Sequence, residues 1–298
     1  MNKPYLTIGI PTYNRKEQIQ RCVRSILPQL NESVCLVVRD NASNYSPASL
    51  FTQEELNLFV LQINPHNIGG DANILSLLAS CTTPWCWVIG DDDPLMMDSL
   101  SRVLKEIEAN PDAAYINFCS RFDTETHCFK EFTDLFGYRR VFNNSYFIAA
   151  CIFNMDKLRD SLYYYYRYQS SMIGQIIFVL KHLEQKDEKC IFRTDYLFAE
   201  HSDNIAWNLT DMVVSASILY YVFYDKRKFL NKTLFKGVTR AFLNRISRSS
   251  DSMRKKLHVT RIIMSHYGTL RTLFFCIWDF SLVLFRNCIP QNLKRKNR

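Results

Sequence analysis

The 298-residue sequence lacks the features that mark exported proteins. Its N-terminus, MNKPYLTIGIPTYNR, has no long apolar stretch followed by small residues, so no signal peptide is predicted. Its ten cysteines are scattered and include no CxxC pair. Without export, these cysteines are expected to be free thiols in a reducing compartment. The sequence therefore predicts a cytoplasmic protein.

Long apolar runs and several ligand-binding signatures are also missing. The apolar runs at 212–224 and 272–285 hold 13 and 14 residues, whereas a membrane-spanning helix needs about 20. The sequence has neither the GxGxxG fingerprint of a dinucleotide site nor an EF-hand calcium loop. It also contains no recognisable nucleic-acid-binding motif. These absences argue against a membrane-spanning anchor and against a nucleic-acid partner.

What is present is a large apolar content with an uneven distribution of charge. Hydrophobic residues make up 47% of the chain and aromatic residues 14%, which suits one sizeable globular domain with a smaller appendage. Residues 1–225 carry a net charge of −8, whereas residues 226–298 hold 18 lysines and arginines against two acids, a net charge of +16. We therefore expect a main domain over 1–205 and a helical, basic and aromatic region over 206–298.

The basic region has two interpretations. A segment of this charge attracts a polyanion, and its short apolar runs suit helices that lie in the plane of an anionic membrane leaflet. The alternative is an ordinary helical core with a solvated basic end. The first interpretation predicts a peripheral protein on the inner face of the cytoplasmic membrane.

The first half of the chain alternates strand-like and helix-like patterns. Short runs of apolar and β-branched residues predict strands at 5–10, 34–38, 58–63, 85–89 and 113–118. Apolar residues with helical spacing predict helices over 19–30 and 98–109. Asn14, with a glutamate three residues later, resembles a capping box, and Asp71 is predicted to cap the helix that follows it. The alternation predicts an α/β fold with a largely parallel central sheet.

Polar stretches follow four of the predicted strands. They are PTYNR (11–15), RDNAS (39–43), NPHNIGG (64–70) and GDDD (90–93). The carboxyl ends of parallel strands lie at one edge of a sheet, and ligands bind at that edge in α/β folds. We therefore expect the four stretches to form one site.

The stretch GDDD places three carboxylates side by side. An isolated acidic triplet at a strand end is most often a solvated turn, but here Trp87 and Pro94 flank it within a hydrophobic stretch. Crowded carboxylates in such surroundings have raised pKa values unless a cation neutralises them. Hard divalent cations take oxygen ligands, and Mg²⁺ is often held by one or two carboxylates together with substrate phosphates. The triplet therefore predicts a divalent-cation site.

Taken in order, IPTYNR, VVRDNAS, NIGG and GDDD resemble the family 2 glycosyltransferases of the GT-A fold over residues 5–125, with a weaker likeness up to residue 205. The variant with NIGGDAN and GDDD is most similar to bacterial sugar transferases that build O-antigens and other surface polysaccharides, including the abequosyltransferase type. The resemblance implies a GT-A fold with a mostly parallel sheet, a nucleotide-sugar donor and a metal-dependent, inverting transfer.

The resemblance also implies a role for each matching residue. Asp92 would hold Mn²⁺ or Mg²⁺ on the donor diphosphate, in a D-x-D-D element whose first Asp is replaced here by Gly90. Asp93 would act on the metal or the sugar hydroxyls as a catalytic residue. Asp40 would accept a hydrogen bond from the nucleotide base, with a turn-forming aspartate as the alternative. The donor-binding residues implied as a group are Pro11, Thr12, Tyr13, Arg15, Asp40, Asn67, Gly69, Gly70, Asp71 and Asp91.

The general base departs from the family pattern. Inverting members use an Asp or Glu to deprotonate the acceptor hydroxyl. The matching stretch here, SSMIGQIIFVL, offers Gln175, which cannot act as a base. The later stretch FAEHSDN provides Glu200, His201 and Asp203 as candidates. We take Asp203 as the predicted catalytic residue and His201 as a predicted metal ligand, with an ordinary surface histidine as the alternative.

The sequence thus predicts a glycosyltransferase that moves a sugar from a UDP, dTDP or CDP donor to a lipid-linked oligosaccharide or other glycan acceptor. A second interpretation, motivated by Gln175 and Gly90, is a non-catalytic homologue that binds nucleotide sugar or scaffolds an assembly. A third, a nucleotidyltransferase, would need a glycine-rich and basic triphosphate loop near the first strand, which the sequence does not have.

Overall fold

The computed structural model describes residues 4–118, 127–129 and 145–199, together with 215, 218–219, 221–226, 254, 257, 261 and 264–265. The chain separates into two compact units, Met1–Ile205 and Ala206–Arg298. Every strand in the described part of the chain belongs to the first unit.

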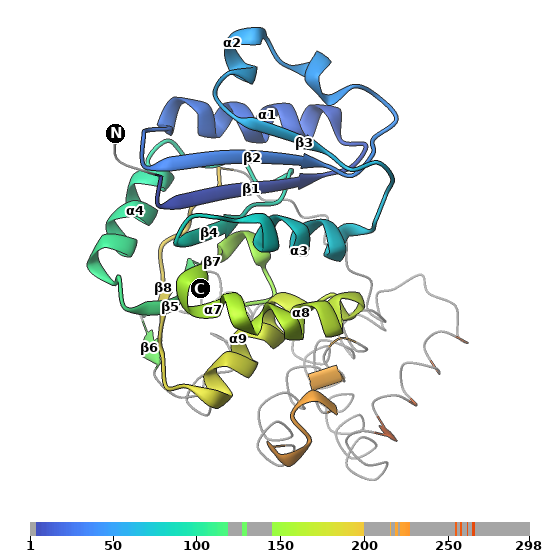
Figure 1. The fold of residues 1–298 in the computed structure, drawn as a ribbon, viewed down its shortest axis with the longest axis vertical. Helices are drawn as coiled ribbons and strands as arrows, with labels where there is room; N and C mark the ends of the chain where they lie inside the picture. Colours follow the sequence, from blue (N-terminus) through green and yellow to red (C-terminus); the bar gives the residue numbers. More distant parts are fainter. Residues whose placement is uncertain are drawn as a thin grey trace, which may run out of the picture. The chain divides into compact units, whose positions relative to one another are not determined.

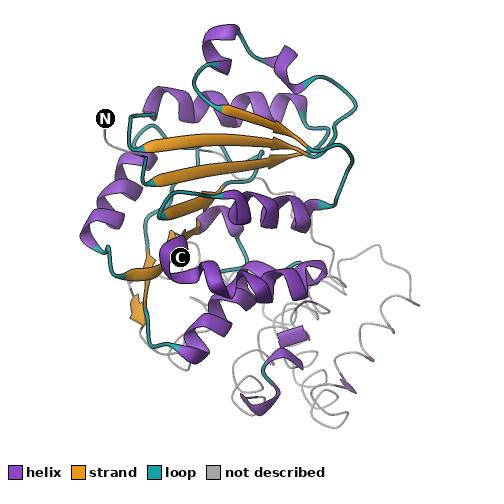
Figure 2. Cartoon of the chain, in the orientation of Figure 1, coloured by secondary structure: helices purple, strands orange, loops and turns teal. Residues whose placement is uncertain are grey.

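One sheet runs through the first unit, and within the described residues it has eight strands in the order β3-β2-β1-β4-β7-β5-β8-β6 (Figures 1 and 2). The strands are β1 (Leu6–Thr12), β2 (Val34–Asp40), β3 (Val60–Ile63), β4 (Trp85–Val88), β5 (Ala113–Phe118), β6 (His127–Phe129), β7 (Cys151–Asn154) and β8 (Lys189–Arg193). The strands β1 to β4 are mutually parallel, β7 is antiparallel to both β4 and β5, and β6 is antiparallel to β8. This confirms the α/β fold with a mostly parallel sheet, and all five predicted strands are present.

Helices cover both faces of the sheet. They are α1 (Lys16–Ile26), α2 (Gln53–Leu56), α3 (Gly70–Ser80), α4 (Ser99–Ala109), α7 (Met155–Leu158), α8 (Leu162–Tyr168) and α9 (Gly174–Gln185). Short 3₁₀ turns are η1 (Leu27–Gln29), η2 (Pro47–Leu50), η3 (Ile148–Ala150), η4 (Arg159–Ser161), η5 (Gln169–Ser171) and η6 (Tyr224–Lys226).

The alternation of side chains along β1 separates the two faces. Ile8 and Ile10 point to one face, where they share a buried cluster with the apolar stripes of α1 and α4. Gly9 points to the other face, where a Cβ would lie 3.2 Å from the side chain of Leu77 in α3. The missing side chain lets α3 approach the sheet closely. Figure 1 shows α1 and α3 on opposite sides of β1 and β2.

Two local predictions are wrong. Asn14 does not cap α1: Arg15 holds the N-cap position without a side-chain hydrogen bond, and Asn14 has a left-handed backbone with φ 55°. Asp71 does not cap α3 either, because the helix begins one residue earlier and its N-cap is Gly69, with φ 89°. In both cases the chain makes a left-handed turn into the helix, so the backbone geometry of the turn replaces the side-chain cap.

The second unit is described at only a few positions. Leu219, Val222 and Phe223 are buried and share one helical face, so this part of the apolar run at 212–224 packs inside the protein. Within the described residues, no helix combines the length and the apolar character needed to cross a membrane. The run at 272–285 and nearly all of the basic residues of 226–298 lie outside the described residues.

Candidate active site

The acidic triplet follows β4, and residues from the end of β1 hold its first carboxylate. Asp91 is 6% exposed. Its Oδ2 accepts a hydrogen bond of 2.8 Å from the Thr12 hydroxyl, and its Oδ1 accepts one of 2.8 Å from the Arg15 guanidinium. The same guanidinium nitrogen lies 3.1 Å from Asp92 Oδ2. Burial raises the pKa of Asp91, while the charge of Arg15 and the Thr12 hydrogen bond oppose that rise.

The other two carboxylates of the triplet each place an oxygen beside Gly90. A Cβ at Gly90 would lie 2.5 Å from Asp93 Oδ2 and 3.1 Å from Asp92 Oδ1. These two oxygens therefore converge on the space that a side chain would fill. The first Asp of a D-x-D-D element could not be accommodated here without moving Asp93, which explains physically why glycine stands at this position.

Asp40 ends β2 beside Thr12 and adopts the turn-forming arrangement. It is 1% exposed, and its two oxygens accept hydrogen bonds from the backbone nitrogen and the hydroxyl of Ser43, at 2.9 and 2.5 Å. Ser43 Oγ in turn accepts a bond of 2.8 Å from the Asn14 backbone nitrogen, and Asn14 Oδ1 accepts one from the Asn44 nitrogen. The stretches PTYNR and RDNAS are thus joined by the hydrogen bond from Asn14 to Ser43, whose side chain Asp40 holds in place.

A buried network of asparagines supports the stretch NPHNIGG. Asn64 Nδ2 donates to Asn41 Oδ1 at 3.0 Å and to Asn73 Oδ1 at 2.9 Å, and its Oδ1 accepts from Arg39 Nε at 3.1 Å. Asn41 Nδ2 donates to Asn67 Oδ1 at 2.8 Å. The network joins the ends of β2 and β3 to the start of α3, which fixes the loop between them.

The remaining predicted donor-binding residues lie on the same loops. Pro11 is the next-to-last residue of β1 and pairs with Arg39 of β2. Tyr13 is 43% exposed just beyond the strand. A Cβ at Gly69 or Gly70 would meet nothing within 4 Å, so the backbone of this loop is open to solvent. The first four strands therefore bring Thr12, Asp40, Gly69 and the triplet to one edge of the sheet.

The predicted base region is only partly described. Gln175 is buried, at 5% exposure, in the first turn of α9. Gly174 before it packs against Tyr165, because a Cβ there would lie 2.1 Å from two ring carbons. Glu200, His201 and Asp203 lie outside the described residues.

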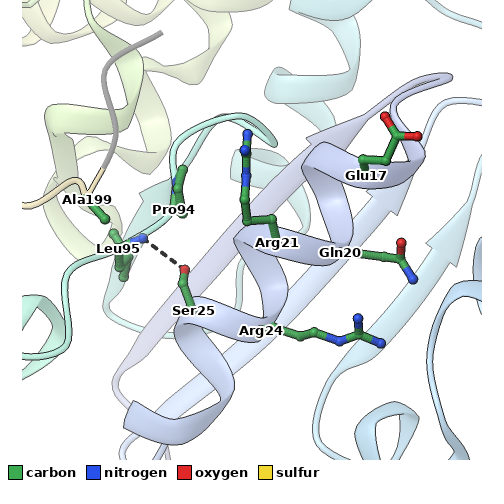
Figure 3. Close-up of a pocket in the computed structure, with 8 residues that line it drawn as sticks. All are labelled: Glu17, Gln20, Arg21, Arg24, Ser25, Pro94, Leu95 and Ala199. Atoms are coloured by element: carbon green, nitrogen blue, oxygen red, sulfur yellow. Dashed lines mark hydrogen bonds between the residues drawn. The ribbon is translucent and has the colours of Figure 1, made fainter.

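A separate hollow of about 580 Å³ lies along α1 and beneath the turn that follows the triplet (Figure 3). Its lining residues are Glu17, Gln20, Arg21, Arg24, Ser25, Pro94, Leu95 and Ala199. The Leu95 backbone nitrogen donates a 2.9 Å hydrogen bond to Ser25 Oγ and joins the turn to α1. The predicted donor-binding residues are not among those that line this hollow.

Sequence reasoning missed the residues that support the site. Asn41, Asn64, Asn73 and Ser43 hold the loops in place, although each lies in or next to a recognised motif. The available signal was the density of Asn and Ser after β2 and β3, since these side chains readily hydrogen-bond to nearby backbone. Several of their partners are 23 to 34 residues away in sequence, which local patterns do not predict.

Comparison with known proteins identifies the class. A family model described as glycosyl transferase family 2 matches residues 7–162, slightly more than half of the chain. The chain therefore belongs to the glycosyl transferase family 2, as its motifs predicted.

One curated relative is similar over part of its length. Abequosyltransferase RfbV of Salmonella typhimurium (strain LT2) is 31% identical over 124 residues, which cover 40% of this chain and 36% of the relative. The match thus spans about a third of that protein and bears out the similarity to the abequosyltransferase type.

Solved structures share the fold. TarS 1–349 of S. aureus has a TM-score of 0.63 at 12% identity, over 88% of this chain and 80% of that one, and it has also been solved in complex with UDP-GlcNAc. The mannosyltransferase PcManGT of Pyrobaculum calidifontis, in complex with GDP-Man and Mn²⁺, has a TM-score of 0.54 at 14% identity, over 93% of this chain and 88% of that one. These likenesses confirm the GT-A fold.

Proposed function

We propose that this chain is a metal-dependent, inverting glycosyltransferase. It moves a sugar from a nucleotide-sugar donor to a lipid-linked oligosaccharide or other glycan acceptor in the synthesis of a bacterial surface polysaccharide. The observation that carries this proposal is the arrangement of the triplet. Asp91 is held by Thr12 and Arg15, while Asp92 and Asp93 bring one oxygen each together beside Gly90, at the carboxyl edge of a family 2 domain.

The triplet fits a divalent cation through two of its three carboxylates. Asp91 is enclosed, with both oxygens bonded by Thr12 and Arg15. Asp92 shares Arg15 with Asp91, but its side chain is 32% exposed, and an oxygen of Asp92 and one of Asp93 converge beside Gly90. Asp92 and Asp93 are therefore the residues that would hold Mn²⁺ or Mg²⁺. Within the described residues, no three His, Cys, Asp or Glu side chains are gathered into a metal site. Two carboxylates with donor phosphates as further ligands are the usual arrangement for Mg²⁺. When bound, the cation stabilises the negative charge that develops on the departing diphosphate.

The loops at the carboxyl edge of the sheet support the nucleotide-sugar donor that we propose. The exposed backbone at Gly69 and Gly70 allows close approach of a nucleotide sugar, and Tyr13 offers an exposed ring just beyond β1. Asp40 is placed next to the same edge, although its carboxylate is shared with Ser43. A UDP, dTDP or CDP sugar is the donor we propose. The UDP-GlcNAc complex of TarS, which has the same fold, supports a donor of this class.

The charge of the second unit supports the membrane location that we propose, and with it a lipid-linked acceptor. Residues 226–298 carry +16, and an anionic leaflet attracts such a segment with about 1 kcal/mol per basic residue near its surface. We place the protein at the inner face of the cytoplasmic membrane, where it meets a lipid-linked acceptor. The main domain over 1–205 then carries the transfer chemistry, and 206–298 docks it.

The test is transfer by the purified full chain with UDP, dTDP, CDP and GDP sugars, measured as release of nucleoside diphosphate. We expect one donor class to be consumed, activity to disappear in EDTA and to return with Mn²⁺. Asp92→Ala should lower kcat at least about 100-fold, which corresponds to about 2.7 kcal/mol of lost transition-state stabilisation.

The matched control is Asp98→Ala. Asp98 lies a few residues further along, forms a surface ion pair with Arg102 and is 67% exposed, so its loss should leave activity unchanged. Full activity in EDTA would contradict the metal role. If Asp92→Ala has normal activity and Asp91→Ala or Asp93→Ala is inactive, the metal ligand is one of the other two carboxylates of the triplet.

A non-catalytic homologue is the second candidate function. The observation in its favour is that Gln175, buried in the first turn of α9, stands where the family resemblance places the base. A chain that binds nucleotide sugar yet neither transfers nor hydrolyses it would support this alternative.

A further inference from the structure

The N-terminus of α3 is joined to the start of α9 by a single carboxylate. Asp71 is the second residue of α3 and follows Gly69 and Gly70 at the carboxyl edge of the sheet. Its Oδ2 accepts a hydrogen bond of 3.0 Å from the backbone nitrogen of Met172, which is 101 positions away in sequence. Met172 has a left-handed backbone, with φ 61°, between η5 and α9. α3 packs against η5 and α8 in the same region (Figure 1).

This contact places Asp71 beside the stretch that lacks an acidic residue. Met172 is three residues before Gln175, the position at which the family resemblance locates the general base. The start of α9 cannot shift easily, because Gly174 packs directly on the ring of Tyr165. The hydrogen bond thus brings a carboxylate of α3 to the segment just before α9, where the stretch SSMIGQIIFVL has none.

The environment of Asp71 suits proton transfer. Only Oδ2 has a hydrogen-bond partner in the described part of the chain, so Oδ1 is available to a substrate. Burial raises the pKa of Asp71 to about 6, against the opposing effect of the Met172 hydrogen bond. A general base is most effective when its pKa lies near the operating pH, and the raised pKa of Asp71 is closer to that pH than the value of about 3.9 of an ordinary aspartate.

Tyr165, whose ring packs on Gly174 at the start of α9, places a buried hydroxyl in the same region. Its hydroxyl is buried and has no hydrogen-bond partner among the described residues. Burial raises the pKa of Tyr165 well above its usual range, and the nearby charge of Asp71 raises it further. A buried hydroxyl without a partner is costly, so a polar ligand group in this region would satisfy it.

We propose that Asp71 is the general base of the transfer reaction, a catalytic role that rests on the proposed function. The acceptor hydroxyl oxygen forms a bond to the anomeric carbon of the donor sugar. The bond from that carbon to the diphosphate oxygen breaks, and its electron pair leaves with the nucleoside diphosphate. The hydroxyl proton passes to Asp71 Oδ1, and the Met172 amide holds Oδ2 in place.

The experiment compares Asp71→Asn, Asp71→Ala and Asp71→Glu in the full chain, with the donor and metal that support wild-type transfer. Asp71→Asn keeps an oxygen to accept the Met172 hydrogen bond but cannot take a proton. We expect its kcat to fall about 10²- to 10⁴-fold, with nucleotide affinity changed less than about threefold. Asp71→Glu, which keeps a carboxylate, should be at least about tenfold more active than Asp71→Asn. The control is Asp98→Asn on the exposed surface.

The pH profile provides a second measurement. The base works only when deprotonated, so wild-type kcat should fall as the pH is lowered through about 6, and this step should be absent from the residual activity of Asp71→Asn. Wild-type-like transfer by Asp71→Asn together with loss in Asp71→Ala would overturn the proposal and leave Asp71 a positioning residue. A wild-type chain that transfers no sugar would refute the proposed function itself, and the base with it.

Discussion

Replacing Asn64 tests whether the buried asparagine network holds the donor loop. Asn64 is 5% exposed and makes three side-chain hydrogen bonds of 2.9 to 3.1 Å, to Asn41, Asn73 and Arg39. Asn64→Ala removes all three. Each is worth about 0.5–1.5 kcal/mol net, and a buried group left without a partner costs about 1–3 kcal/mol.

The three partners of Asn64 do not all lose their last hydrogen bond, and this narrows the expected change in the free energy of unfolding. Asn41 Oδ1 keeps a 3.0 Å bond from the Ile68 nitrogen, and Arg39 keeps its bond to Gln62. Asn73 Oδ1 loses the one hydrogen bond that the described residues give it. We therefore expect Asn64→Ala to lower the free energy of unfolding by about 2–4 kcal/mol.

The assay is urea denaturation followed by tryptophan fluorescence, since Trp85 and Trp87 are buried in β4. The matched control is Asn57→Ala, an exposed asparagine bonded only to Gln53 within the described residues, which should cost less than about 0.5 kcal/mol. Donor binding should weaken in Asn64→Ala because the loop through Gly69 loses its support. Equal destabilisation by the two substitutions, or unchanged donor binding by a folded Asn64→Ala, would refute the reasoning.

Three further predictions concern the donor, the pH dependence and the membrane. Asp40→Ala should raise the KM for the donor more than it lowers kcat, as measured by steady-state kinetics, because the role proposed for Asp40 is to bind the donor base and not the reacting bond; a large loss of kcat at constant KM would contradict this. At pH 8 the free energy of unfolding of Asp71→Asn should be about 1–3 kcal/mol higher than that of the wild type. The raised pKa favours folding when the carboxyl is protonated, and that benefit is lost as the pH rises through about 6, so the difference in urea unfolding should shrink at pH 4. Vesicle co-sedimentation should show salt-sensitive binding to anionic vesicles and much less to neutral ones, with weaker binding after removal of 272–298; loss of nucleotide binding in the truncated chain would show instead that this segment is structural.

The sheet could be predicted from the sequence because its strands are locally marked. The runs that form β1, β2, β4 and β5 are apolar, β-branched and bounded by polar turns, so their positions follow from pattern alone. The insertion of β7 between β4 and β5, antiparallel to both, could not be predicted. Strand order depends on long-range pairing, which leaves no trace in a local pattern.

The candidate site, like the sheet, could be predicted from the sequence only in part. The four motif stretches and their common edge were predicted, because parallel strands deliver their carboxyl ends together. The side-chain contacts were not. Asp40 turns to Ser43, Arg15 binds the triplet and Asp71 reaches Met172, and each of these contacts depends on how loops fold against one another. Left-handed turns at Asn14 and Gly69 replaced the expected caps for the same reason.

Arg15 gives the triplet a counter-charge that belongs to the chain itself. Because Asp91 is satisfied by Arg15 and Thr12, the fold does not depend on a metal to neutralise the most buried carboxylate of the triplet. Metal and nucleotide sugar are then expected to enter as one complex, with the diphosphate completing the coordination that Asp92 begins. Kinetically, the enzyme would follow an ordered scheme in which free metal alone binds weakly. A chelator would therefore act as a reversible inhibitor of turnover, and dialysis against metal should restore the full rate without refolding.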